Sequence, residues 1–122
     1  MMHSVIISLA SNHDAKQNLN EARCCLAQIF SQIKYTAETL TEPVNARRKD
    51  KYVNQLARFE TTLSAEETNS QLKAIEQQIG RTDEDRKLGI VNIDLDLLMH
   101  GDERYHQKDW ERSYVQDLLA QL

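Results

Sequence analysis

Two aspartates stand at alternate positions of a short apolar run, Val91-Asn92-Ile93-Asp94-Leu95-Asp96-Leu97. If this run is a β-strand, successive side chains point to opposite faces, so Asp94 and Asp96 share one face about 6.6 Å apart. Like charges at this spacing repel and are unfavourable in a strand. A divalent cation offsets the repulsion, and Mg²⁺ prefers carboxylate oxygens together with substrate phosphates. The alternative is a solvated sheet face that carries charged residues, and the pair alone does not exclude it.

The apolar pattern predicts the elements that would position the two aspartates. Strands are expected at 5–9, 34–40, 52–62 and 91–99, and a helix with apolar residues every three or four positions follows a cap at Asn12 or Asp14. A second helix starts at the capping box Ser64-Ala65-Glu66-Glu67 and ends near Gly80, and the tail 109–122 is expected to be helical. Residues 41–51 and 81–90 are expected to be loops.

This order, βαββαβ plus a terminal helix, predicts an α+β fold. We expect a ferredoxin-like antiparallel sheet with two helices on one face and the other face open, in a single domain over residues 1–122. On the strand 91–99, the apolar residues would face the helices. Asn92, Asp94 and Asp96 would then share the open face.

Composition excludes some classes of protein. A net charge of −4 argues against a general nucleic-acid binder, which normally carries a basic surface. No apolar run approaches the roughly 20 residues that cross a membrane, and the start lacks the pattern of a signal peptide. Two adjacent cysteines, Cys24 and Cys25, suit a reducing compartment. We therefore expect a cytoplasmic protein that binds neither nucleic acid nor membrane.

Several short motifs, in collinear order from residue 5 to about residue 115, resemble those of the 6-hydroxymethyl-7,8-dihydropterin pyrophosphokinase (HPPK) family. Ala10-Ser11-Asn12 resembles the family's Gly-Ser-Asn, and Tyr52-Val53-Asn54 resembles its Tyr-Leu-Asn. Ile93-Asp94-Leu95-Asp96 resembles Leu-Asp-Leu-Asp. Further matches are Thr41, Pro43 and Val44, which resemble the family's loop that touches the pterin, Glu76 with Gly80-Arg81, and the spacing of His106, Arg112 and Tyr114.

The resemblance implies a pyrophosphokinase that transfers pyrophosphate from ATP to 6-hydroxymethyl-7,8-dihydropterin in folate biosynthesis. It implies two Mg²⁺ ions held by Asp94 and Asp96, with ATP as co-substrate. The catalytic residues would be Asp94, Asp96, Arg81 and His106. The substrate-binding residues would be Thr41, Pro43, Val44, Tyr52, Asn54 and Tyr114, and the nucleotide-binding residues Arg81, Arg86, Lys87, Arg104, His106 and Arg112. The expected partners are ATP and a pterin, bound by a monomer or a weak dimer.

The loop before the two aspartates departs from the family pattern. The family's loop is rich in arginine and contains a tryptophan, whereas this chain has Asp83, Glu84 and Asp85, with Leu88 at the position of the tryptophan. Each charge-assisted phosphate contact is worth about 1.5–3 kcal/mol, so these changes would weaken the binding of a triphosphate. Two alternatives therefore stay open: an inactive homologue that binds pterin or nucleotide, and a ferredoxin-like interaction module.

Overall fold

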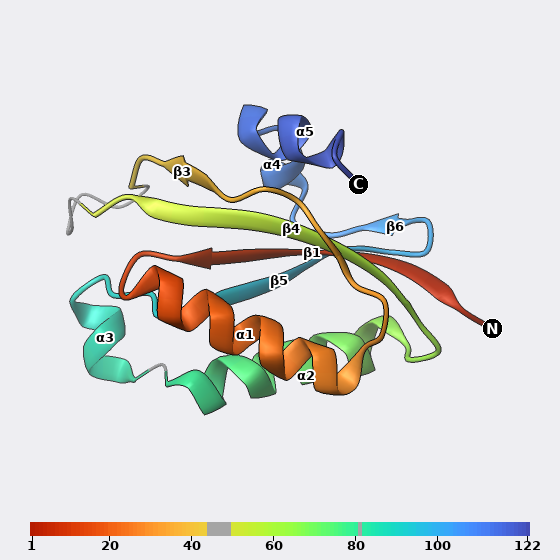
Figure 1. Ribbon diagram of the computed structural model, residues 1–122, viewed down its shortest axis with the longest axis horizontal. Coiled ribbons are helices and arrows are strands. Elements are labelled where there is room, and N and C mark those ends of the chain that lie inside the picture. The colour runs from red at the N-terminus through yellow and green to blue at the C-terminus, as the bar shows by residue number, and fades with distance from the viewer. Residues whose placement is uncertain (44–49, 81) are drawn as a thin grey trace.

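One antiparallel sheet, with helices on both of its faces, organises the chain (Figure 1). The computed structural model describes residues 1–43, 50–80 and 82–122, without the side chain of Arg86. The long strands are β1 (His3–Ser11), β4 (Tyr52–Thr61) and β5 (Asp94–His100), and the short ones are β2 (Lys34–Tyr35), β3 (Thr39–Thr41) and β6 (Glu103–Arg104). The strand order is β2-β4-β1-β5-β6, and β3 also pairs with β4. The predicted α+β class and ferredoxin-like sheet are confirmed.

Two long helices, α1 (Ala15–Ile29) and α2 (Ala65–Ile79), cover one face of the sheet (Figure 1). The stripe that α1 buries consists of Leu19, Ala22 and Leu26, and it packs in one core with apolar residues of β1 and β5. The predicted capping box at the start of α2 is present, because Ser64 and Glu67 exchange hydrogen bonds. Gly80 ends α2 at a φ of 106°. Among the described residues, no helix is both long and apolar enough to cross a membrane.

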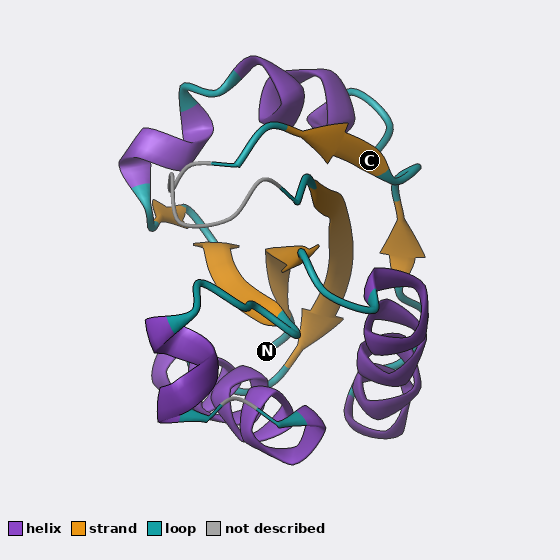
Figure 2. Ribbon diagram, turned by 90° about the vertical axis from the view of Figure 1, so that its left-hand side faces the viewer, coloured by secondary structure: helices purple, strands orange, loops and turns teal. Residues whose placement is uncertain are grey.

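Two short helices at the C-terminal end, α4 (Gln107–Trp110) and α5 (Ser113–Leu119), lie against the opposite face. Figure 2, turned by 90°, shows helices on both sides of the strands. A second apolar cluster joins Ile6, Leu56 and Leu98 of the sheet to Trp110, Val115 and Leu118. The indole Nε1 of Trp110 donates to the carbonyl oxygens of Leu98 and Tyr105, at 3.2 and 3.0 Å. The face that was expected to be open is therefore covered over part of its area.

Some predicted boundaries are wrong. Residues 34–40 form two short strands, the tail forms two helices, and the segment 81–90 contains a short helix, α3 (Asp83–Lys87). The strand predicted from Val91 begins at Asp94, because Val91 bonds Asn12 through both its backbone N–H and its carbonyl oxygen. Asp14 occupies the N-cap of α1 at a φ of 43°, but its side chain accepts no capping hydrogen bond.

Trp110 provides a test of how the C-terminal helices are attached. We predict that Trp110→Ala lowers the free energy of unfolding by about 3–5 kcal/mol, because it removes a large buried ring. Trp110→Phe keeps much of the apolar area and should cost clearly less. Urea denaturation followed by circular dichroism measures both changes. An alanine variant within 1 kcal/mol of the wild type would show that the ring does not anchor these helices.

Candidate active site

The face of the sheet opposite α1 and α2 is divided into a polar and an apolar part. In the strand register, Ala10 of β1 lies between Asn54 of β4 and Asp94 of β5, and Ser8 lies beside Asp96. The next residues along the same face, Ile6, Leu56 and Leu98, belong to the apolar cluster under α4 and α5. The polar part forms the floor of a cavity of about 170 Å³. Its lining residues are Ser8, Ala10, Thr41, Tyr52, Asn54, Asp94, Asp96, Asp109, Arg112 and Tyr114.

The two aspartates reach this cavity because the alternation of β5 turns them away from the helices. Leu95 and Leu97, between and after them, are buried in the core beneath α1 and α2. The side chain of Asp96 keeps 20% of its surface exposed. The prediction that Asp94 and Asp96 share the face opposite the helices is confirmed.

Side chains of α2 complete the open edge of β5. The backbone N–H of Leu95 donates to Glu76 Oε2 at 2.7 Å, and its carbonyl oxygen accepts from Lys73 Nζ at 2.8 Å. Glu76 is only 5% exposed, so its carboxylate needs these partners. Lys73 and Glu76 also form an ion pair with each other, in which Lys73 Nζ donates to Glu76 Oε2 at 3.0 Å. Among the residues that the structure describes, no strand neighbours this edge at Leu95, and the ion pair supplies the hydrogen bonds that a strand would give.

Lys73 also reaches the cavity's carboxylates. Its third hydrogen bond goes to Asp96 Oδ1 at 3.3 Å, so its three N–H donors meet three acceptors. Burial lowers the pKa of Lys73, but the hydrogen bond and the negative charge of Glu76 raise it, and the charges of Asp96 and Asp94 raise it further. The net pKa therefore lies above the ordinary value. Lys73 is held as an ammonium ion at neutral pH.

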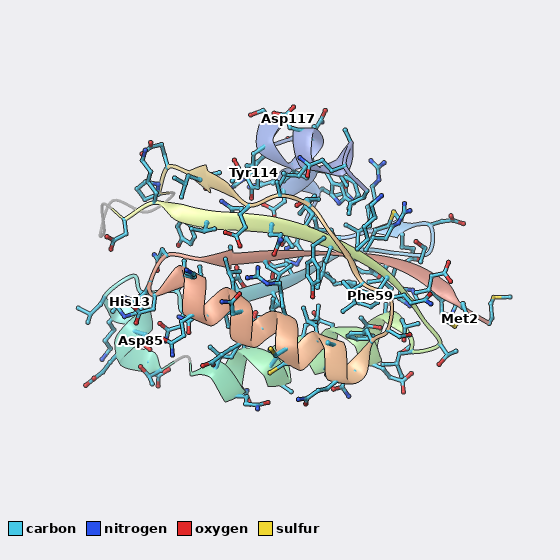
Figure 3. The ribbon with its side chains drawn as sticks, in the orientation of Figure 1. Met2, His13, Phe59, Asp85, Tyr114 and Asp117 are labelled. Carbon is cyan, nitrogen blue, oxygen red and sulfur yellow. The ribbon has the colours of Figure 1, made fainter. Side chains whose placement is uncertain are left out.

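Residues of the C-terminal helices α4 and α5, and of the turn between them, form the wall of the cavity opposite the sheet. Arg112 lies between them and pairs with Asp109 of α4, with Nε 3.6 Å from Oδ1. Tyr114 of α5 faces the sheet, whereas Asp117 of the same helix points outward (Figure 3). Burial raises the pKa of Tyr114, although the Arg112 guanidinium opposes the shift and the Asp109 carboxylate adds to it. The cavity wall therefore combines two tyrosine rings with three carboxylates and one guanidinium.

Asn54 and Thr41 form the wall contributed by β3 and β4. The amide Nδ2 of Asn54 donates to Thr41 Oγ1 at 2.7 Å and to the carbonyl oxygens of Tyr52 and Thr39, at 3.4 and 3.5 Å. These bonds fix the plane of an amide that is only 5% exposed. Asn54, Thr41 and Tyr52, three of the predicted substrate-binding residues, therefore lie together at the cavity.

His106 lies at the junction of the cavity with a second hollow. Its Nε2 is 3.9 Å from Asp96 Oδ1. The second hollow has a volume of about 380 Å³ and is lined by Ala65, Glu66, Asn69, Leu97, Tyr105 and His106. His106 thus links the larger hollow, which it lines together with Tyr105, to Asp96 in the wall of the small polar cavity.

The segment that leads into β5 is fixed by the Ser-Asn pair at the end of β1. Asn12 donates from Nδ2 to the carbonyl oxygen of Gly89 at 2.9 Å and accepts at Oδ1 from the N–H of Val91 at 2.7 Å. The prediction that Asn92 shares a face with Asp94 and Asp96 is wrong. Asn92 lies before the strand, and its amide donates to the carbonyl oxygen of Gly80 and to Asp85.

The structure does not bring every predicted residue to the cavity. Arg104 of β6 stacks on Trp110, with its guanidinium carbon 4.3 Å from the ring centroid. Lys87 is exposed on α3 and, like Pro43, does not line the cavity. Val44, Arg81 and the side chain of Arg86 lie outside the described residues.

Three residues that contribute to the site, Lys73, Asp109 and Ser8, were not predicted from the sequence. Lys73 and Glu76 are three positions apart on the second predicted helix, which is a common spacing for an ion pair. This spacing is the one feature of the sequence that could have indicated Lys73. Asp109 pairs with Arg112 at the same spacing, but nothing in the sequence shows that α4 folds back over the sheet. Ser8 becomes part of the cavity only through the register between β1 and β5.

Comparison with known proteins gives a family match over nearly the whole chain. Residues 6–122 match the profile described as 7,8-dihydro-6-hydroxymethylpterin-pyrophosphokinase (HPPK). The chain is 32% identical over 130 residues to a "Folate synthesis bifunctional protein, mitochondrial" from Arabidopsis thaliana, covering 98% of this chain and 23% of that protein. It is 30% identical over 105 residues to a "2-amino-4-hydroxy-6-hydroxymethyldihydropteridine pyrophosphokinase" from Haemophilus influenzae, covering 84% of this chain and 65% of that protein. The chain spans about a quarter of the length of the bifunctional relatives.

Glu76 tests how the edge of β5 is closed. We predict that Glu76→Ala lowers the free energy of unfolding by about 1–3 kcal/mol, because it leaves the Leu95 N–H without its acceptor and removes the closer of the two carboxylates that pair with Lys73. Glu76→Gln keeps an oxygen at this place and should cost less than the alanine variant. Chemical denaturation measures both. Equal stability of the wild type and Glu76→Ala would contradict this role of the carboxylate.

Proposed function

This chain belongs to the 7,8-dihydro-6-hydroxymethylpterin-pyrophosphokinase family, and on that basis we propose that it transfers pyrophosphate from ATP to 6-hydroxymethyl-7,8-dihydropterin. The observation that carries the proposal is that Asp94 and Asp96 line one cavity together with Asn54. An interaction module has no need of two carboxylates and a buried amide on one cavity wall. Family membership likewise favours the transferase over that alternative.

The proposed reaction makes one bond and breaks one. The hydroxymethyl oxygen of the pterin attacks the β-phosphorus of ATP, the bond from that phosphorus to the α-phosphate bridge oxygen breaks, and AMP leaves. The proton of the hydroxyl group goes to a base or to water. Phosphoryl transfer of this kind depends mainly on alignment of the reactants and on neutralisation of phosphate charge.

The residues present fit magnesium. Among the described residues, no three His, Cys, Asp or Glu side chains are grouped to hold a metal ion. Mg²⁺ does not require such a group, because it commonly binds one or two carboxylates together with substrate phosphates and water. We assign this role to Asp94 and Asp96, with two ions as the proposed number. When bound, the ions would neutralise charge on the triphosphate.

The two hollows suit the two substrates. The cavity of about 170 Å³ is smaller than a typical drug-sized pocket, so it suits a small bicyclic ring and not a whole nucleotide. Tyr52 and Tyr114 offer ring faces there, and Asn54 and Thr41 offer polar edges. The nucleotide would occupy the larger hollow at His106, with its phosphates reaching across Asp96 toward Arg112.

The other predicted nucleotide contacts keep a more limited role in this proposal. Arg81 and Arg86 remain proposed phosphate contacts, and Lys87 of α3 lies beside the second of them in sequence. Arg104 is committed to Trp110 in this structure. The cationic charge available to the triphosphate is therefore concentrated on Arg112 and the segment around α3.

The proposal is tested by incubating the protein with ATP, Mg²⁺ and 6-hydroxymethyl-7,8-dihydropterin and measuring AMP by chromatography. We expect AMP to form. Asp94→Asn and Asp96→Asn should each slow its formation about a thousandfold, because each variant removes a carboxylate that would hold the metal ions, and these ions would neutralise the charge of the phosphates. Asp117→Asn is the matched control. Asp117 is exposed on the outer side of α5, and its variant should keep wild-type activity (Figure 3).

The same experiment separates the alternatives. If no AMP forms but the pterin still quenches the fluorescence of Trp110, the protein is a binding homologue without this activity. If neither AMP nor quenching appears, the interaction module is favoured. If AMP forms at the same rate in the Asp94 and Asp96 variants, the cavity is not the catalytic site.

A further inference from the structure

Lys73 has no part in the chemistry proposed above, yet its ammonium group bonds one of the proposed metal ligands. It comes from α2, on the face of the sheet that α1 and α2 cover, and reaches the open edge of β5. The charged groups that face it are Glu76 on its own helix, and Asp96 and Asp94 on β5. One oxygen of Asp96 is thus already paired with a positive charge.

The three hydrogen bonds of Lys73 are not equivalent. Those to the Leu95 carbonyl oxygen and to Glu76 are 2.8 and 3.0 Å long, whereas the bond to Asp96 is 3.3 Å. The Lys73 side chain is 42% exposed, and Glu76 is almost fully buried. The ammonium can therefore give up Asp96 to water or to a competing cation while it keeps the two contacts that close the strand edge.

We propose that Lys73 is a positioning residue that competes with metal ions for Asp96. In the protein without metal it neutralises and orients the carboxylate, and it gives up this contact when a divalent cation binds the acidic pair. The inference rests on the proposed function, because it takes Asp94 and Asp96 as the metal ligands. It goes further by assigning to this chain an internal cation that weakens metal binding in the absence of nucleotide.

The test is the affinity of the whole protein for Mn²⁺ without nucleotide, measured from the electron paramagnetic resonance signal of free Mn²⁺. Lys73→Gln removes the charge but keeps an amide that can donate to Leu95 and Glu76. Because a unit charge close to a divalent ion is lost, we expect Lys73→Gln to bind Mn²⁺ about tenfold more tightly than the wild type. Lys73→Arg keeps the charge and should bind like the wild type.

Lys34→Gln is the matched control. Lys34 belongs to β2, at the far side of the sheet from β5, so its variant changes the net charge equally without touching the acidic pair. We expect its Mn²⁺ affinity to lie within about twofold of the wild type. If Lys34→Gln and Lys73→Gln strengthen binding equally, net charge accounts for the effect and the inference is overturned.

The remaining outcomes separate this inference from the proposed function. Tighter binding by Lys73→Gln supports the inference even if neither protein forms AMP, in which case only the proposed reaction fails. Unchanged or weaker binding by a folded Lys73→Gln variant, in a protein that does form AMP, overturns the inference alone. Binding that Asp96→Asn leaves intact shows that the metal lies elsewhere and also overturns it.

Discussion

The candidate site depends on how the open edge of β5 is closed. Glu76 accepts from the backbone N–H of Leu95 at 2.7 Å and Lys73 donates to its carbonyl oxygen at 2.8 Å, so α2 completes an edge at which no strand of the described part of the chain pairs. The pairing of β5 with β1 places Leu95 in the core under α1 and α2, and because successive side chains of a strand alternate, Asp94 and Asp96 point to the opposite face. The ion pair therefore completes the sheet at this edge and holds in place the strand that carries the two carboxylates of the cavity.

A second constraint divides the sheet face that those carboxylates share. The apolar part consists of Ile6, Leu56 and Leu98, and Trp110 and the helix α5 shield these side chains from water. The polar part is left as a floor, and the residues that connect the cover to it, Arg112 and Tyr114, become its upper wall. The cavity thus follows from covering only the apolar part of the sheet. Two short helices achieve this, and the core on the other face is provided by α1 and α2.

Local patterns in the sequence were sufficient for the parts of the site that lie on one element. The alternation around Asp94 predicted the face of both aspartates, and Ser64 with Glu67 predicted the start of α2. Long-range contacts were not predictable in this way. Asn12 holds Val91 out of the strand, and Lys73 reaches Asp96 across 23 positions of sequence. The acidic segment at Asp83 was expected to be a loop, but reciprocal bonds between Thr82 and Asp85 begin a short helix there.

The central claim is that Asp94 and Asp96 together bind a divalent cation on the face of the sheet opposite α1 and α2. Line broadening by substoichiometric Mn²⁺ in an amide NMR spectrum tests it most directly, because paramagnetic broadening is confined to the surroundings of the ion. The account predicts broadening at residues 94–96 and at their β1 neighbours Ser8 and Ala10, and its loss in Asp96→Asn. Broadening centred on the acidic residues of α3, with β1 and β5 unaffected, would contradict it.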